Sequence, residues 1–186
     1  ETFIAVAVTA AVVLAWRAER RPLRLLAAGA ALGVAFWLKY NALVFALPVV
    51  AAALMASSAD RRSAARSLSW IAAGAAGSVV LVLALFAAAG ALTDLWLGTV
   101  AYNVRYSGET YADPWHAGRY LLTFPLMHAR VDGLWFTGGL GAASLILVRR
   151  FDRATVLMLA WIAAACLSIS VNGSRGLPQY FVQAAP

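Results

Sequence analysis

The chain has 186 residues, of which 63% are hydrophobic and 12% are charged, and its mean hydropathy is +0.78. Soluble globular proteins have roughly 45–50% apolar and about 25% charged residues, so this composition excludes an ordinary soluble domain. The net charge of +7 does not indicate nucleic-acid binding, because the arginines fall in short clusters between apolar runs, as they do in cytoplasmic loops. We therefore expect an all-α, polytopic transmembrane helical bundle in the cell membrane.

The first apolar run covers residues 2–16 and is followed by a basic connector at residues 17–24. As a helix, this run would be about 22 Å long, which is shorter than the ~30 Å hydrocarbon core of a bilayer. We interpret the chain as an internal fragment of a longer protein, in which upstream residues complete the span. Pro22 in the connector is suited to the first turn of the next helix.

Residues 25–56 are apolar except for Lys39, Tyr40 and Asn41. The run is too long for one span and somewhat short for two. Both flanking connectors are basic, and the positive-inside rule places both on the cytoplasmic side, which requires two crossings. We predict a helical hairpin with arms at 25–38 and 41–56, whose tip at Lys39 lies at the extracytoplasmic surface.

Small residues mark where helices are expected to approach each other closely. Gly29 and Gly33 form a small-xxx-small pattern in the first arm of the hairpin. Gly74, Gly77 and Ser78 are similar positions in the next predicted span. We expect the first pair to bring the helices of the hairpin together.

The remaining chain continues the alternation of apolar runs and connectors, with expected spans at 69–92, 133–148 and 154–171. Residues 93–132 combine aromatic residues, charges, prolines and glycines, which indicates an extracytoplasmic loop with interfacial helices in which no long helix continues. Another span is expected to start near residue 181. The prediction is one transmembrane domain over residues 1–186 with about six spans: 2–16, 25–38, 41–56, 69–92, 133–148 and 154–171.

The distribution of basic residues supports this topology. Of the 15 lysines and arginines, ten fall in the three short connectors that are expected in the cytoplasm. These ten are Arg17, Arg20, Arg21, Arg24, Arg61, Arg62, Arg66, Arg149, Arg150 and Arg153. The other five are Lys39, Arg105, Arg119, Arg130 and Arg175, which are spread over much longer extracytoplasmic segments.

Two cations on the expected extracytoplasmic face are candidates for binding a lipid phosphate or pyrophosphate at headgroup depth. They are Lys39 and Arg175, and Gly173 and Gly176 would allow a backbone to approach closely beside Arg175. The alternative is that Lys39 extends to the lipid headgroups and Arg175 serves as a headgroup anchor.

Other chemistry-bearing residues carry weaker signals. His116 and His128 do not have the spacing of a metal pair, and no metal site is predicted. No spacing singles out a general base or metal ligand among the extracytoplasmic carboxylates, and Glu1 differs from the others because it leads into an apolar helix. Cys166 lies in an apolar run and is interpreted as a small buried hydrophobic residue.

These residues resemble the family 39 glycosyltransferases, which include the protein O-mannosyltransferases and the aminoarabinose transferase of lipid A. The resemblance is carried by three stretches in order: Glu1 before an apolar helix, residues 29–48 with Gly33-Val-Ala-Phe-Trp-Leu-Lys39-Tyr40 and Leu47-Pro48, and residues 175–186, Arg-Gly-Leu-Pro-Gln-Tyr-Phe-Val-Gln-Ala-Ala-Pro. It covers most of the chain in order and spacing.

The resemblance implies a GT-C fold and a sugar transfer on the extracytoplasmic side, from a polyprenyl-phosphate donor to a lipid, glycan or protein acceptor. It places Lys39 and Arg175 near the donor phosphate, with Tyr40, Gln179 and Tyr180 lining the site. Glu1 would correspond to a carboxylate at the start of a helix in the middle of the family's chain. The family's catalytic aspartate would lie upstream of Glu1, and a divalent cation is compatible with the resemblance as a cofactor.

Two other classes of protein remain as alternatives. A transporter or flippase segment would use Lys39 and Arg175 to line a substrate path, but charged or helix-breaking residues would then be expected near the centres of several spans. A structural membrane subunit would leave the occurrence of both cations on one face unexplained. The concentration of polar groups at one face favours the enzyme.

Overall fold

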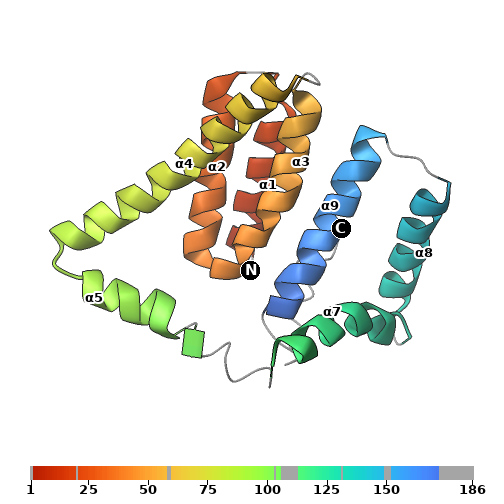
Figure 1. Ribbon diagram of the computed structural model, residues 1–186. Coiled ribbons are helices and arrows are strands. Elements are labelled where there is room, and N and C mark those ends of the chain that lie inside the picture. Colours follow the sequence, from red (N-terminus) through yellow and green to blue (C-terminus); the bar gives the residue numbers. More distant parts are fainter. Residues whose placement is uncertain are drawn as a thin grey trace. The chain divides into compact units, whose positions relative to one another are not determined.

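The computed structural model describes residues 2–19, 21–57, 60–102, 104–105, 113–130, 132–148 and 152–171, and all regular elements within these ranges are helical (Figure 1). The chain divides into two compact units, Glu1–Tyr106 and Ser107–Pro186. The all-helical class predicted from the sequence is therefore confirmed for the described residues. That the two units form one transmembrane domain stays a prediction.

The first unit begins with helices that alternate in direction (Figure 1). In chain order, its elements are α1 (Thr2–Trp16), α2 (Pro22–Leu38), the 3₁₀-helix η1 (Tyr40–Phe45), α3 (Ala46–Ala56), α4 (Arg61–Ala88), α5 (Leu92–Leu95) and the π-helix η2 (Trp96–Ala101). The first helix has the bounds expected from the sequence. Pro22 is in the first turn of α2, as predicted, where its missing N–H costs no helical hydrogen bond.

The predicted hairpin is present as two arms joined at Lys39. The second arm contacts α2 mainly through η1, and α3 makes few contacts with α2. Instead α1 packs against both α2 and α3 (Figure 1). One face of α1 is buried in these contacts through residues spaced by three or four: Ile4, Val8, Ala11, Val12 and Ala15.

The two glycines of α2 approach a helix other than the one expected. A Cβ atom on Gly29 would lie less than 3.0 Å from the carbonyl oxygen of Ile71, and one on Gly33 equally close to Oγ of Ser78, both in α4. In the opposite direction, a Cβ on Gly74 would meet the carbonyl oxygen of Leu26. Gly29 and Gly33 therefore allow α2 and α4 to cross with their backbones in contact. The prediction that these glycines bring the two arms of the hairpin together was wrong.

The close contacts of α4 at this crossing lie between Ile71 and Ser78. The buried residues of α4 are Ser67, Ile71 and Gly74, and from Val79 to Ala88 none is buried. Helix α4 ends at Ala88 and is followed by Gly90, whose φ of +68° suits glycine. The N–H of Ala91 closes the end of the helix by donating to the carbonyl of Phe86 at 2.8 Å.

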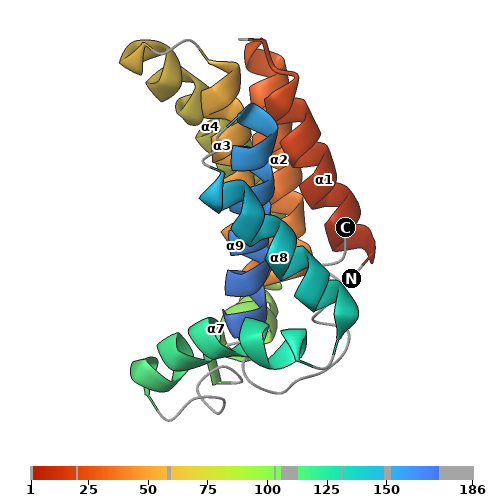
Figure 2. The ribbon, with the colours of Figure 1, turned by 90° about the vertical axis from the view of Figure 1, so that its right-hand side faces the viewer.

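The second unit contains α7 (Pro114–Ala129), α8 (Gly133–Leu147) and α9 (Arg153–Val171). Helix α7 packs against both α8 and α9 and lies crosswise at one end of them, as both views show (Figures 1 and 2). It runs for 16 residues through Pro125, so the expectation that prolines and glycines break any long helix in residues 93–132 was wrong here.

Several predicted boundaries also differ from the structure. Helix α4 starts at Arg61 rather than residue 69, because Asp60 caps it by accepting hydrogen bonds from the N–H groups of Arg62 and Ser63 at 3.3 and 3.2 Å. It ends at Ala88 rather than residue 92. The second arm of the hairpin starts as a 3₁₀-helix, η1, before α3.

Among the described helices, two are long and apolar enough to cross a bilayer. They are Arg61–Ala88, which contains an 18-residue window with a mean hydropathy of 2.3, and Arg153–Ser170, with a mean hydropathy of 1.7. The shorter apolar helices Phe3–Trp16, Pro22–Leu38, Tyr40–Ala56 and Trp135–Leu147 coincide with the other four predicted spans. Each of these four has fewer than 18 residues. The lengths of the described helices therefore do not support the six predicted spans.

Candidate functional site at the Lys39 turn

Lys39 is held in an extended conformation between two helices. Its φ of −163° and ψ of 120° end α2, and the same residue precedes η1. Its N–H donates to the carbonyl of Ala35 at 3.0 Å, and its own carbonyl accepts from the N–H of Ala42 at 2.9 Å. Because hydrogen bonds fix the backbone on both sides, the position of the Lys39 Cα is set by the two helices.

The residues that follow Lys39 anchor the turn to the unit. Asn41, Ala42 and Phe45 in η1 are only 3%, 1% and 3% exposed, and η1 contacts both α2 and α1. Lys39 and Tyr40 themselves are half-buried. The side chain of Lys39 therefore starts from a backbone that the buried residues of η1 hold in place.

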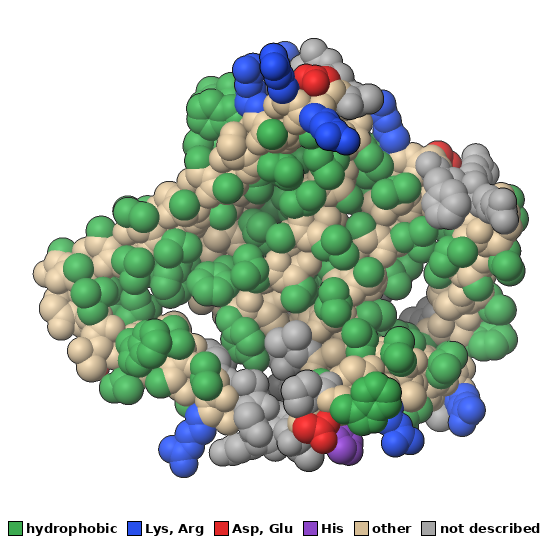
Figure 3. All heavy atoms as spheres, in the orientation of Figure 1, with side chains coloured by type: hydrophobic (Ala, Val, Ile, Leu, Met, Phe, Trp, Pro, Cys, Tyr) green, Lys and Arg blue, Asp and Glu red, His purple; other side chains and the backbone are tan. Residues whose placement is uncertain are grey.

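The charge distribution separates the two ends of the first unit. The ends of α1, α2 and α4 that carry or adjoin arginines come together (Figure 1), and Lys and Arg side chains gather there (Figure 3). These arginines are Arg17, Arg21, Arg24, Arg61, Arg62 and Arg66. Lys39 lies at the other end of α2. The opposite placement of Lys39 and the arginines is the arrangement that the positive-inside rule predicts for a hairpin.

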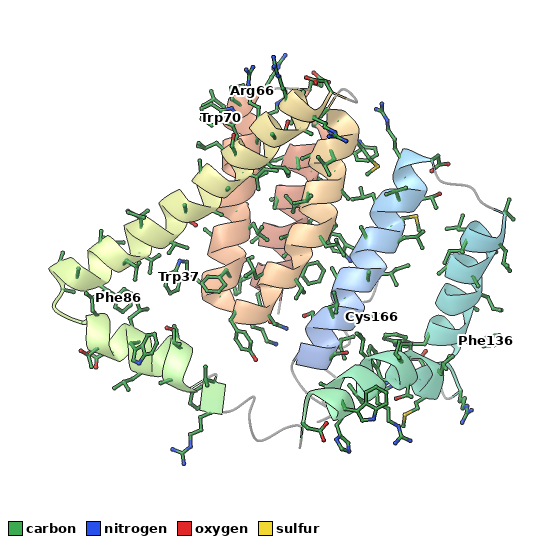
Figure 4. All side chains as sticks on the ribbon, in the orientation of Figure 1. Trp37, Arg66, Trp70, Phe86, Phe136 and Cys166 are labelled. Carbon is green, nitrogen blue, oxygen red and sulfur yellow. The ribbon has the colours of Figure 1, made fainter. Side chains whose placement is uncertain are left out.

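Tryptophans mark both ends of the same unit. Trp70 lies near Arg66 at the arginine end, and Trp37 lies near the Lys39 end of α2 (Figure 4). Trp16 is the last residue of α1, and Trp96 is the first of η2. Tryptophan is enriched where a membrane protein passes from hydrocarbon to water, because its ring is apolar and its N–H is polar.

Trp37 is a residue that sequence reasoning did not single out. Its indole Nε1 is buried and has no hydrogen-bond partner among the described residues, and its ring meets that of Phe36 edge-on, with centroids 5.4 Å apart. In Figure 4 the ring points away from α2, into the space between α2 and the far half of α4. The available signal was its position, two residues before Lys39 at the end of a predicted span.

The structure describes part of the predicted site. Lys39 and Tyr40 are adjacent at the turn, and α1 starts at the same end of the unit (Figure 1). Glu1, Arg175, Gln179 and Tyr180 lie outside the described residues, so the pairing of Lys39 with Arg175 stays a prediction.

The histidines take part in local contacts of α7. Asp113 caps this helix: its Oδ1 accepts from the N–H of His116 at 2.9 Å and lies 2.9 Å from Nδ1 of the same residue. The backbone hydrogen bond from His116, followed by the one from its side chain, lowers the pKa of Asp113. Nδ1 of His128 lies 3.1 Å from the carbonyl oxygen of Phe124.

Within the described part of the chain, no group of three or more His, Cys, Asp or Glu side chains comes together. Comparison with protein-family models, curated proteins and solved structures finds no match. The assignment of function therefore depends on the Lys39 turn, the charge distribution and the apolar helices.

Proposed function

We propose that the chain is the membrane-embedded part of a glycosyltransferase that takes a sugar from a polyprenyl-phosphate donor. In this proposal Lys39, together with Arg175, binds the donor phosphate on the extracytoplasmic face, with Tyr40, Gln179 and Tyr180 lining the site. The acceptor is a lipid, glycan or protein. The observation that carries the proposal is the rigid Lys39 turn at the end of α2 opposite to the arginines.

The surface of α4 supports the membrane embedding. The 18-residue apolar window of α4 is only 11% buried, whereas the core helix of a soluble protein would be mostly buried. Val80, Leu81 and Leu85 are 62%, 60% and 60% exposed. Such a continuous exposed apolar surface is unfavourable in water, and it is the normal state of a helix that faces lipid.

The chemistry of the transfer explains why cations at this depth would be useful. When the sugar leaves, negative charge grows on the lipid phosphate, and a fixed ammonium or guanidinium group stabilises that charge more strongly where water is excluded. A base, which the family resemblance places upstream, must take the proton of the acceptor. The described residues thus supply a phosphate contact rather than the complete active site.

The proposal is tested by measuring, with thermophoresis, the affinity of the chain in detergent for a polyprenyl monophosphate. Loss of one charge-assisted contact of about 1.5–3 kcal/mol would weaken binding by roughly 10- to 100-fold, so Lys39→Ala should show this loss and Lys39→Arg should retain most of the affinity. The matched control is Arg66→Ala, which removes a cation at the other end of the unit and should leave the affinity unchanged. Equal affinities of Lys39→Ala and Arg66→Ala would refute the phosphate contact.

A further inference from the structure

Helix α7 has two apolar faces, and one is filled by the unit itself. Phe124 is 0% exposed, and its ring packs against those of Tyr120, His128 and Trp135, with centroids 5.2, 6.1 and 5.8 Å apart. This face joins α7 to the start of α8. Burial on the same face raises the pKa of Tyr120.

The second apolar face points away from this cluster. Trp115, Leu122 and Leu126 are 76%, 75% and 67% exposed. Their spacing of seven and four residues places them on one side of the helix, and Phe124, nine residues after Trp115, lies on the opposite side. A helix of 16 residues, about 24 Å long, thus presents a stripe of large apolar side chains that no described part of its own unit covers.

Basic residues accompany this stripe. Arg119 and Arg130 are exposed and fall beside Trp115 and Leu126 on the same side of the helix. The acidic residue at the helix start, Asp113, is directed to the N–H of His116. Figure 3 shows apolar and basic side chains together along α7. Large apolar residues beside arginines are suited to the surface of a bilayer, where the apolar residues contact hydrocarbon and the arginines contact lipid phosphates.

The orientation of α7 within its unit fits such a surface. Helix α9 is one of the two described helices that are long and apolar enough to cross a bilayer. Helix α7 lies crosswise at the end of α9 that is remote from Arg153 (Figures 1 and 2). If α9 crosses the membrane, a helix lying crosswise at its end is parallel to the membrane plane. By the positive-inside rule, this end is the extracytoplasmic one.

We infer that α7 is an interfacial helix whose exposed face binds anionic phospholipid, with Trp115, Leu122 and Leu126 in the headgroup–acyl boundary and Arg119 and Arg130 on lipid phosphates. The inference rests on the membrane embedding in the proposed function, although it does not require sugar transfer. It assigns a lipid-binding surface in the second unit, separate from the phosphate contact proposed for Lys39.

The depth of α7 is measured on the full chain in bilayer nanodiscs, in a Cys166→Ala background, with a nitroxide attached at Leu122→Cys. Collisions with oxygen and with a water-soluble nickel chelate report the depth of the label. We expect Leu122 to lie about 5–10 Å into the boundary region, so that oxygen reaches it better than nickel does. His116→Cys, on another side of α7, should remain accessible to nickel. Leu126→Cys is a second position on the same face.

A label at Leu83→Cys on α4 separates the inference from the proposed embedding. If this label lies in the bilayer core while Leu122 and Leu126 are as accessible to nickel as His116, then α7 is not interfacial and the embedding stands. If the labels on both helices are accessible to nickel, the embedding itself is wrong, and the inference fails with it.

The lipid preference is tested by extracting the chain from vesicles of phosphatidylcholine mixed with phosphatidylglycerol and measuring the ratio of the two lipids that copurify. An arginine near an anionic surface contributes the equivalent of about a fivefold preference, so Arg119→Gln and Arg130→Gln should each lower the enrichment of phosphatidylglycerol by about that factor. Replacing both with lysine keeps the charge and should retain most of the enrichment. An unchanged ratio in the Arg119→Gln/Arg130→Gln double variant would overturn the phosphate contact.

Discussion

The backbone contact between α2 and α4 makes a quantitative prediction about Gly29. Replacing Gly29 with alanine adds a Cβ less than 3.0 Å from the carbonyl oxygen of Ile71, a backbone atom that cannot rotate away. The helices must therefore separate locally, and such overpacking typically costs about 1–3 kcal/mol. The gain in helix propensity from glycine to alanine, about 1 kcal/mol, partly offsets this cost.

Gly77 provides the matched control, because it lies in α4 and a Cβ added there would meet nothing within 4 Å. Gly77→Ala carries the same change in helix propensity without the clash, so it should stabilise the protein by about 0.5–1 kcal/mol. The difference between the two variants is then the overpacking term alone, and Gly29→Ala should be less stable than Gly77→Ala by about 1–3 kcal/mol.

The assay is reversible unfolding in mixed micelles of increasing denaturing-detergent fraction, followed by far-ultraviolet circular dichroism. The double variant Gly29→Ala/Gly74→Ala should cost less than the sum of the single variants, because both Cβ atoms act on the same crossing and one separation accommodates both. If Gly29→Ala is as stabilising as Gly77→Ala, the two backbones are not in contact and the reasoning is wrong.

Three further predictions concern other contacts. Gly33→Ala should destabilise the first unit, and Ser78→Gly should restore most of the loss, because the added Cβ meets Oγ of Ser78; no rescue in the detergent titration would contradict the contact. Lys39→Cys with Cys166→Ala should react with an impermeant thiol reagent only from the extracytoplasmic side, and labelling only from the cytoplasm would exclude the predicted hairpin. Asp113 has a lowered pKa in the folded protein, so its capping contribution is present above its unfolded-state pKa of about 3.8 and is lost as pH falls through the lower folded-state value. The protection factors of the amides in the first turn of α7, which are the intrinsic exchange rates at each pH divided by the observed rates, should fall at low pH in the native chain and not in Asp113→Asn.

The sequence predicted those features that depend on local pattern. The break at Lys39 follows from one charged residue between two apolar runs, and Pro22 marks the start of α2 because its ring favours the first helical turn. The charge asymmetry of the first unit could also be derived, since it required only the order of basic and apolar segments.

Features that depend on which helices pack together could not be derived in the same way. The glycines of α2 indicated a close approach, yet a small-residue pattern does not name its partner, and α4 rather than α3 occupies that face. The extension of α4 back to Arg61 required recognising Asp60 as a cap within a basic segment. The buried indole N–H of Trp37 depends on the placement of neighbouring side chains, which composition does not encode.

The crossing of α2 and α4 has a consequence for how the first unit responds to its surroundings. At Gly29 and Gly74 the two helices touch through backbone atoms, so these particular contacts do not depend on large apolar side chains. The hydrophobic effect stabilises a contact only if the separated helices are exposed to water, whereas van der Waals contact between backbones stabilises it in lipid as well. The pairing of α2 with α4 should therefore have similar strength in lipid, detergent or water, and it is the contact of this unit expected to survive transfer between them.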